Sequence, residues 1–594
     1  MIIIAESIGS LITNIPKGVI TKLNISMTNT SNLGDTLEVV VIYFDKQKAE
    51  EATINLGAKF EDLGYNFAVI TIETSKIGQL AQEPSIQYIE FPKSLYFSDI
   101  ESNEAACILR ARNTFNLQGN GVIVGFIDSG IDYTHPAFLN EQGNTRVKYI
   151  YDISKSESKV YTEDDINTAL KSMDPYSIVP VYDNTGHGTH VAGIAAAGGN
   201  INENYYGVAP KASIIMVKSA RGYYSLSTSI MRGIKFLIDK SNELRMPLVI
   251  NMSLSTNDGA HDGRSLLEEY ISTVSNLNRV TIAVSAGNEG DAAHHIGGEL
   301  KNDTVVKFEV APGEFNVVIN LYKSILPNIA IKLITPAGKP TGYIEVLEGY
   351  IEGVISGNRY QIYNTGPKPF DVTGEIGISL NNDNKEILSG LWTIEIKIIN
   401  QYEGIYDMWL PIAEGLNKGT RFLNPTISNT LGIPATVYNI ISVGSYSYST
   451  RTISPFSGRG KSILTGNIKP NIVAPGSGIY GPAPSNSYDR KTGTSMAAPH
   501  VAGACALMME WGILKGNDPY LYGERLKHYM IIGAKRERRD IDYPDNSWGY
   551  GELCLYNALQ KVIEVLGITV GQELRNVNQY EDYYIGNLFI RNPL

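Results

Sequence analysis

Three residues in this sequence have side chains that could act together in nucleophilic catalysis. Asp128 ends the apolar run GVIVGFIDSG, His187 lies in GHGTHVAG, and Ser495 lies in GTSMAAPHVAG. A serine hydroxyl alone is a poor nucleophile: it needs an imidazole that takes its proton and a carboxylate that orients the imidazole. All three groups are present, each beside small residues that let the backbone approach closely.

The order of these residues along the chain, Asp, then His, then Ser, separates the known arrangements of such triads. Chymotrypsin has His before Asp before Ser, and the α/β-hydrolases place Ser first. The hydrolase motif G-x-S-x-G would also require Gly at position 497, where this sequence has Ala497. An esterase of that class is therefore disfavoured.

The segments around these residues alternate between strand and helix patterns. Continuous apolar runs predict strands buried on both faces, and amphipathic stretches between them predict helices. This rhythm predicts an α/β fold with a doubly wound parallel sheet, whose sites lie at the carboxyl ends of the strands. The predicted strands are 121–130, 212–220, 247–255 and 279–288, and the predicted helices are 227–245 and 263–277.

Two other regions have different patterns. The first predicts a small α+β domain, with strands at 36–44, 66–74 and 86–92 and helices at 48–64 and 75–83. The other has short strands separated by Gly, Pro and Asn, which predict an inserted antiparallel β-sandwich of the jelly-roll kind. The predicted domains are an N-terminal domain 1–98, an α/β domain in two parts, 99–298 and 429–594, and the insertion 299–428.

Composition narrows the classes of function. The 594 residues are 43% hydrophobic and 19% charged, with a formal net charge of −11, so a nucleic-acid partner is not expected. No apolar run is long enough to span a membrane, and the N-terminus lacks the pattern of a Sec signal, so we expect a cytoplasmic or spore-associated protein. The three cysteines are far apart and lack ligand spacing, which disfavours a disulfide framework or a zinc site.

The motifs DSGID, GHGTHVAG, SAGNEG and GTSMAAPHVAG occur in this order, and with them the sequence resembles the subtilisin-like serine proteases, or subtilases. The resemblance implies a serine endopeptidase with Asp128, His187 and Ser495 as its catalytic triad. It also implies that Asn288 and the backbone N–H of Ser495 form the oxyanion hole. The implied substrate-binding residues are Ser253, Leu254, Ser255, Ser285, Ala286 and Gly287.

The resemblance also bears on maturation and cofactors. The N-terminal domain resembles the subtilase prodomain, with self-cleavage within 94–99, near Phe97, and the cut prodomain retained as a partner beside protein or peptide substrates. No cofactor is required by the sequence, and no metal ligands are assigned. Calcium is common in the family, but the Asp of its strongest site is replaced here by Ala137.

A narrower resemblance rests on the short prodomain, the stretch 161–190 and the inserted β domain. These features are similar to the clostridial Csp-type subtilases, which implies limited proteolysis of a proenzyme such as a spore cortex-lytic enzyme during germination. Two alternatives remain open: a catalytically restrained sensor or binding protein, and a broad-specificity intracellular housekeeping protease. The insertion is interpreted either as a binding module for a partner or carbohydrate, or as a brace.

Other polar residues receive structural interpretations. His187 and His190 have HxxH spacing but lack a third ligand, so His190 is expected to pack on its helix. Asp183 is interpreted as a helix cap. His261, His294 and His295 are expected in loops at the rim of the cleft.

Overall fold

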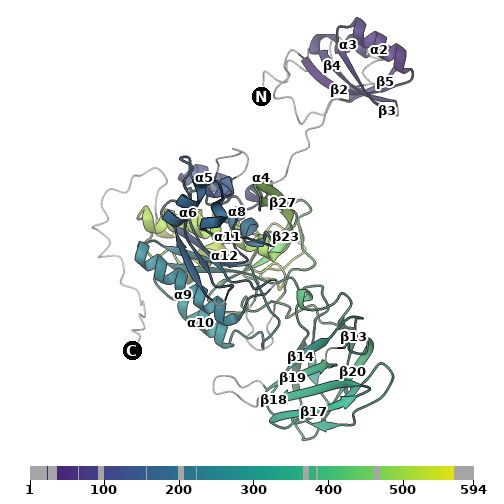
Figure 1. The fold of residues 1–594 in the computed structure, drawn as a ribbon, viewed down its shortest axis with the longest axis vertical. Coiled ribbons are helices and arrows are strands. Elements are labelled where there is room, and N and C mark those ends of the chain that lie inside the picture. The colour runs from purple at the N-terminus through teal and green to yellow at the C-terminus, as the bar shows by residue number, and fades with distance from the viewer. Residues whose placement is uncertain are drawn as a thin grey trace. The chain divides into compact units, whose positions relative to one another are not determined.

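The structure is a computed structural model in which the chain forms two compact units, Met1–Phe97 and Ser98–Leu594 (Figure 1). The expected self-cleavage segment 94–99 and the tail after residue 567 lie outside the described residues. The structure describes residues 23–24, 36–64, 66–90, 100–155, 157–198, 206–222, 224–364, 374–382, 385–460 and 468–567.

The N-terminal unit contains a five-stranded sheet with the order β1-β5-β2-β4-β3. Its core includes Val39, Val41 and Ile70, so the α+β prediction is confirmed. One detail was wrong: residues 59–64 form strand β3 and not the end of a helix, because the helix stops before Gly57, whose φ is +70°. The elements are β1 (Leu23–Asn24), β2 (Thr36–Tyr43), α2 (Lys46–Asn55), β3 (Lys59–Gly64), β4 (Phe67–Glu73), η2 (Thr74–Lys76), α3 (Ile77–Leu80) and β5 (Ile86–Glu90).

The second unit is organised around a nine-stranded sheet with the order β24-β23-β11-β10-β6-β9-β7-β8, in which β25 also pairs with β23. Neighbours from β23 to β7 are parallel. Every residue of β6, β10 and β11 is buried, as their continuous apolar runs predict. The strands are β6 (Ile123–Asp128), β7 (Val147–Asp152), β8 (Lys159–Thr162), β9 (Ser213–Lys218), β10 (Leu248–Met252), β11 (Val280–Ser285), β23 (Ile441–Ser447), β24 (Thr452–Ile453) and β25 (Ile472–Pro475).

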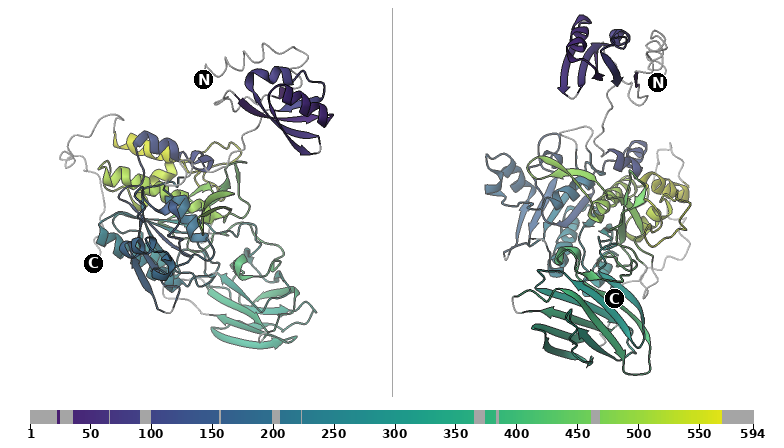
Figure 2. Two further views of the ribbon diagram at one scale, coloured as in Figure 1. Left: turned by 45° about the horizontal axis from the view of Figure 1, so that its top comes forward. Right: turned by 90° about the vertical axis from the view of Figure 1, so that its right-hand side faces the viewer.

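Helices cover both faces of this sheet (Figures 1 and 2). Val124 and Phe126 of β6 join the cluster that contains α8, α11 and α13, whereas Ile123 and Ile127 join the cluster of α9 and α10. The predicted doubly wound sheet is confirmed. The helices are α4 (Ile100–Ala105), α5 (Ile108–Phe115), η3 (Pro136–Phe138), α6 (Glu163–Leu170), α7 (Pro175–Ile178), α8 (His187–Ala196), α9 (Ser227–Leu244), α10 (Leu266–Val274), α11 (Thr494–Met509), the π-helix η5 (Glu510–Leu514), α12 (Gly523–Ile532) and α13 (Leu555–Leu566).

The region between β11 and β23 forms an antiparallel sandwich of two sheets, with the orders β12-β21-β14-β19-β18-β17 and β16-β15-β20-β13-β22. Side chains such as Phe308, Ile378 and Trp392 fill the space between them. The hairpin β17–β18 was not indicated by the sequence, because its outward residues include polar ones such as Glu352 and Arg359. The elements are β12 (His295–Leu300), β13 (Thr304–Val310), β14 (Asn316–Lys323), β15 (Ile329–Ile334), β16 (Ile344–Glu345), β17 (Gly349–Ile355), β18 (Asn358–Asn364), β19 (Gly374–Asn381), β20 (Gly390–Ile398), β21 (Gly404–Trp409), η4 (Ala413–Gly415) and β22 (Arg421–Phe422).

The sequence disfavours a disulfide framework, but the described residues contain one disulfide that it did not indicate. Cys107 and Cys554 are bonded, with their Cα atoms 4.9 Å apart, although 447 residues separate them in sequence. The same junction includes a hydrogen bond from Lys535 Nζ to the Ala105 carbonyl (2.6 Å). The bond attaches the first helices of the second unit to α13, a proximity that sequence spacing does not reveal.

One helical stretch, Thr494–Leu514, is long and apolar enough by composition to span a membrane, as judged within the described residues. Of its most apolar window, 89% is buried inside the protein. It is the central helix of the second unit, and it begins at the residue before Ser495.

Candidate active site

Asp128 is the last residue of β6 and is almost fully buried. Its Oδ1 accepts hydrogen bonds from the backbone N–H of Ser129 and from Nδ1 of His187, both at 2.7 Å. A buried carboxylate is stable only with such partners. The structure therefore brings together Asp128 and His187, as the sequence predicts.

Asp183 fixes the start of α8, on which His187 is the first residue. The Asp183 carboxylate accepts hydrogen bonds from the N–H groups of Gly186 (3.0 Å) and Thr189 (2.8 Å) and from the Thr189 hydroxyl (2.6 Å). The N-cap residue of α8 is Gly186, so Asp183 is not the N-cap itself, although its carboxylate satisfies N–H groups at the start of the helix. Sequence reasoning missed a further link, in which the Ser129 hydroxyl donates to Asp183 at 2.7 Å and so ties Asp183 to the end of β6.

Gly188 explains why α8 can lie so close to β6. A Cβ atom at this position would be 2.2 Å from the carbonyl oxygen of Gly130 and 3.1 Å from Cβ of Asp128. No side chain fits there. The glycine after His187 in the GHGTHVAG motif is thus a packing requirement of the Asp–His contact.

The electrostatics of the pair favour a protonated imidazole. Burial lowers the pKa of His187, but the charge and hydrogen bond of Asp128 raise this pKa by more, with a smaller rise from Asp183. The pKa of His187 therefore lies above the ordinary value of 6.5. The His187 side chain is 31% exposed, so proton exchange with solvent remains open.

Ser495 is the second residue of α11, which packs beside α8. Gly503 permits this approach, since a Cβ there would be 2.9 Å from the carbonyl oxygen of Ala195. The Ser495 hydroxyl donates to the Ser253 carbonyl at 3.3 Å and, among the described residues, forms no hydrogen bond with His187. Catalytic hydrogen bonds are often long or poorly aligned before substrate binds, so this geometry is compatible with a serine nucleophile.

Asn288 is oriented by the start of α11. Its Oδ1 accepts from the backbone N–H (3.0 Å) and hydroxyl (2.9 Å) of Thr494. The oxygen of the amide must face this N–H, so Nδ2 remains on the other side as a donor. A Cβ at Gly493 would be 3.5 Å from Asn288 Nδ2 and 3.7 Å from the Ser495 nitrogen, so both donors lie beside one small space.

The two predicted substrate segments lie next to each other. A Cβ at Gly432 would be 2.4 Å from Cβ of Ser255, and one at Gly287 would be 3.5 Å from Oγ of Ser255, so the serine side chain lies between two glycines. Ser285 and Ala286 are buried. Within the described chain, the backbone groups of Leu254 and Ser255 have no hydrogen-bond partner.

The carbonyl groups of the second segment are already occupied. Gly432 N–H donates to the Ala286 carbonyl (2.8 Å), and Gly458 N–H donates to the Gly287 carbonyl (2.9 Å). Of the two segments, residues 254–255 therefore have the backbone groups that could pair with an extended peptide.

The surroundings of Ala137, which replaces the expected calcium-binding Asp, do not fit a calcium ion. Ala137 has no carboxylate, and its carbonyl accepts hydrogen bonds from Arg146 Nη2 (2.7 Å) and Gly198 N–H (2.8 Å). Arg146 also donates to the Ala196 carbonyl at 2.6 Å. Its guanidinium group thus uses oxygens that could otherwise bind a cation. The described residues contain no group of three or more His, Cys, Asp or Glu side chains that could hold a metal ion.

His190, His261, His294 and His295 are buried, so the expectation that the last three lie at a cleft rim was wrong. They lie where the sandwich joins the α/β domain, and His261 and His295 both stack on Trp409, with ring centroids 4.2 and 4.9 Å away. His190 packs within α8 and contacts the Asp489 carbonyl at 3.1 Å. Burial lowers the pKa of His190 to about 4.

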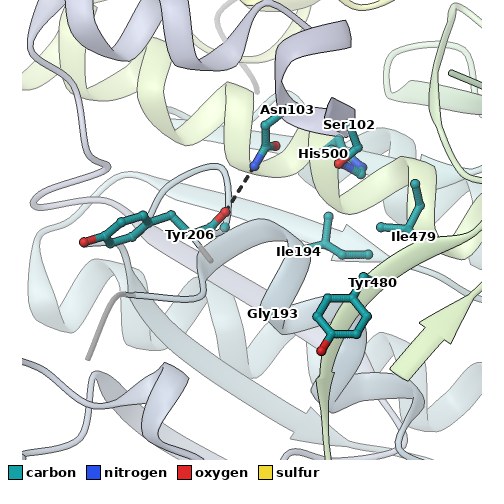
Figure 3. A pocket seen from close by; sticks show the side chains of 9 residues that line it. Ser102, Asn103, Gly193, Ile194, Tyr206, Ile479, Tyr480 and His500 are labelled. Carbon is teal, nitrogen blue, oxygen red and sulfur yellow. Dashed lines mark hydrogen bonds between the residues drawn. The ribbon is translucent and has the colours of Figure 1, made fainter. Parts of the chain in front are cut away.

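A small cavity lies between α4, α8 and α11 (Figure 3). Asn103 Nδ2 donates to the Tyr206 carbonyl at 3.1 Å, and His500 Nε2 lies 3.2 Å from the Ser102 hydroxyl. The cavity volume is about 10 Å³. It has room for about one water molecule and is not a substrate site.

Comparison with known proteins agrees with this fold. The model of the subtilase family matches residues 119–318 and 397–551, and the gap between the two segments lies in the sandwich. The model of the Csp protease B prodomain matches residues 5–93. The chain belongs to the subtilase family and carries a Csp-type prodomain.

Among solved structures, the chain is similar to the CspB protease of Clostridium perfringens. The two are 50% identical with a TM-score of 0.76, and the match covers 78% of this chain and 98% of the other. This chain is also 25% identical to the PI-type proteinase of Lactococcus lactis subsp. cremoris, in a match that covers 83% of this chain. It is 29% identical to subtilisin E of Bacillus subtilis, in a match that covers 38% of this chain. The chain spans 28% of the lactococcal proteinase and 50% of subtilisin E.

The His187 environment predicts a specific titration. In the Ser495→Ala variant, we expect the His187 ring signals to titrate by NMR with a midpoint above 6.5, because the Asp128 carboxylate stabilises the imidazolium ion. Adding Asp128→Asn should lower the midpoint, because burial then acts without that carboxylate. The signals that are missing in the His187→Gln variant are those of the His187 ring. An identical midpoint in the presence and absence of Asp128 would contradict this description of the pair.

Proposed function

We propose that this chain is a serine endopeptidase that uses Asp128, His187 and Ser495. The observation that carries the proposal is the 2.7 Å Asp128–His187 hydrogen bond at the end of β6, whose neighbouring strand β10 leads into Ser253, the residue that Ser495 contacts. The order of the residues and their placement on a subtilase sheet support it. Protein or peptide substrates follow from this activity, and no nucleic-acid partner is proposed.

The reaction begins when Ser495 Oγ attacks the scissile carbonyl carbon. His187 accepts the serine proton at Nε2 while Nδ1 remains hydrogen-bonded to Asp128, which keeps the ring in the required tautomer. The imidazolium ion then donates this proton to the leaving amine, and the acyl-enzyme forms. A water molecule, deprotonated by His187, hydrolyses the acyl-enzyme and restores the serine.

The negative charge of the tetrahedral intermediate requires donors. Asn288 Nδ2 and the backbone N–H of Ser495 lie beside the same space, and Thr494 holds the Asn288 amide in place. Preorganised donors of this kind act most strongly where charge develops in the transition state. Residues Leu254 and Ser255 would bind the substrate backbone as an added strand, and Ser285, Ala286 and Gly287 would form the neighbouring wall.

The physiological role we propose is limited proteolysis of a spore cortex-lytic proenzyme during germination. The Csp-type prodomain and the 50% identity to the CspB protease support this over a general digestive role. We propose that the prodomain is cut by Ser495 within 94–99 and stays bound. A spore-associated location is compatible with the Cys107–Cys554 bond, since disulfides are rare in the cytosol.

Autoprocessing gives a direct prediction. Wild-type protein should be recovered as two fragments that co-purify, with a new N-terminus between about residues 92 and 102. This range allows for an error of about four residues in the predicted end of the prodomain. Ser495→Ala should remain a single intact chain because the nucleophile is absent. Intact mass and N-terminal sequencing measure both. A cut Ser495→Ala chain, purified alone, would rule out self-cleavage.

Cleavage selectivity distinguishes the proposed role from its alternatives. Incubated with a purified cortex-lytic proenzyme, wild-type protein should produce one shortened product, and with a denatured proteome it should cut few sites. Ser495→Ala is the matched control. Extensive proteome cleavage would favour a housekeeping protease instead. Failure to hydrolyse the proenzyme and a diverse peptide library would favour the sensor.

A further inference from the structure

Glu289 directly follows Asn288. Its side chain connects the loop of residues 287–290, which we call the catalytic loop, to the inserted sandwich. Its side chain is only 3% exposed. Oε1 accepts a hydrogen bond from the backbone N–H of Ala413 (3.1 Å), and Oε2 accepts one from His294 Nδ1 (2.6 Å). Both partners lie at the ends of the sandwich, which begins at β12, earlier than the predicted residue 299: His294 directly precedes β12, and Ala413 begins η4 after β21.

The His294 ring is held on both sides. Its Nε2 lies 3.2 Å from the carbonyl oxygen of Thr420, which also belongs to the insertion. Nδ1 of His294 thus contacts the Glu289 carboxylate and Nε2 contacts the Thr420 carbonyl, so both ring nitrogens are held by oxygen atoms. The carboxylate of the loop that holds Asn288 is therefore hydrogen-bonded to a buried histidine at the start of the sandwich.

The substrate segment reaches the same junction. Asn257, two residues after Ser255, donates from Nδ2 to the Leu410 carbonyl (3.0 Å) and also lies 3.5 Å from Glu289 Oε2. Leu410 N–H in turn donates to the His294 carbonyl at 2.9 Å. One short stretch of the insertion thus contacts both the loop of Asn288 and the strand predicted to bind substrate.

The backbone hydrogen bonds of residues 287–290 show how much support the Glu289 side chain adds to this loop. Gly287 and Gly290 are anchored on one side, by bonds from Gly458 N–H (2.9 Å) and to the Phe456 carbonyl (2.8 Å). On the other side, the Glu289 side chain is the hydrogen-bonded link from residues 287–290 to the insertion in the described chain. Besides these backbone bonds and the Thr494 contact, the sandwich therefore gives the position of Asn288 a further support through Glu289.

We propose that Glu289 is a positioning residue through which the inserted sandwich holds Asn288 in the geometry that stabilises the oxyanion. The inference rests on the proposed function. It assigns the insertion a part in catalysis by the α/β domain, although none of its residues is proposed to touch the substrate. Glu289 does not transfer protons in this reaction.

Glu289→Gln tests the inference with little change in shape. The glutamine oxygen can still accept from Ala413, but its amide NH₂ cannot accept from a protonated Nδ1 of His294, so the charge-assisted hydrogen bond is lost and only a neutral one can replace it. We expect kcat to fall about 10-fold, less than the roughly 10²- to 10³-fold expected for losing an oxyanion donor, as in Asn288→Ala. KM should change less than about threefold, because ground-state binding does not use the oxyanion hole.

Two further variants separate positioning from general destabilisation. Ala413→Pro removes only the N–H that Glu289 accepts: proline is tolerated at the start of a helix, and Ile412 already has the extended conformation that precedes it (ψ 160°). It should lower kcat in the same direction as Glu289→Gln. The matched control is Glu510→Gln, a buried glutamate outside this junction, which accepts from the backbone N–H groups of Gln118 and Gly119. It should lower thermal stability but keep the wild-type kcat.

The decisive measurement is a double-mutant cycle of Glu289→Gln and Asn288→Ala, with kcat per titrated active site on a peptide substrate. If Glu289 acts through Asn288, the double variant should have the kcat of Asn288→Ala alone. Multiplicative losses, or an unchanged kcat in Glu289→Gln and Ala413→Pro with an active wild type, would overturn the inference. An inactive wild type would overturn the proposed function, and this inference with it.

Discussion

The buried hydrogen bond between Asp128 and His187 is the constraint on which the rest of the active site depends. A carboxylate at the end of a fully buried strand is costly without partners, and here Ser129 and His187 supply them. The contact requires α8 to start at the end of β6, and this in turn requires a glycine at 188 and the Asp183 hydrogen bonds. Helix, strand and Asp183 are therefore parts of one electrostatic arrangement.

The second half of the site depends on α11. This helix is apolar on nearly all sides, so it can only lie in the centre of the unit, where its first turn meets the ends of β10 and β11. Thr494 then orients Asn288, and Ser253 contacts Ser495. The sandwich adds a support from outside the sheet through Glu289, His294 and Ala413. The protein therefore combines a family fold with a junction that belongs to its own insertion.

Much of this could be predicted from the sequence. The parallel sheet followed from continuous apolar runs such as that of β6, and the four site motifs identified the residues that the structure brings to the sheet edge. Features that depend on distant partners could not be predicted. Cys107 and Cys554 are 447 residues apart, and the buried state of His261, His294 and His295 depends on how the sandwich packs against the α/β domain. Strand β3 was missed because residues 59–64 lack a clear alternating pattern, and tertiary pairing with β4 decided their conformation.

The central claim is that Ser495 is a nucleophile activated by His187, and active-site labelling tests it most directly. Wild-type protein would be incubated with a fluorophosphonate, and the adduct would be located by peptide mapping. We expect one adduct per active chain, on Ser495, and little or none in His187→Ala, since that variant lacks the base. An adduct elsewhere, or equal labelling without His187, would contradict the account.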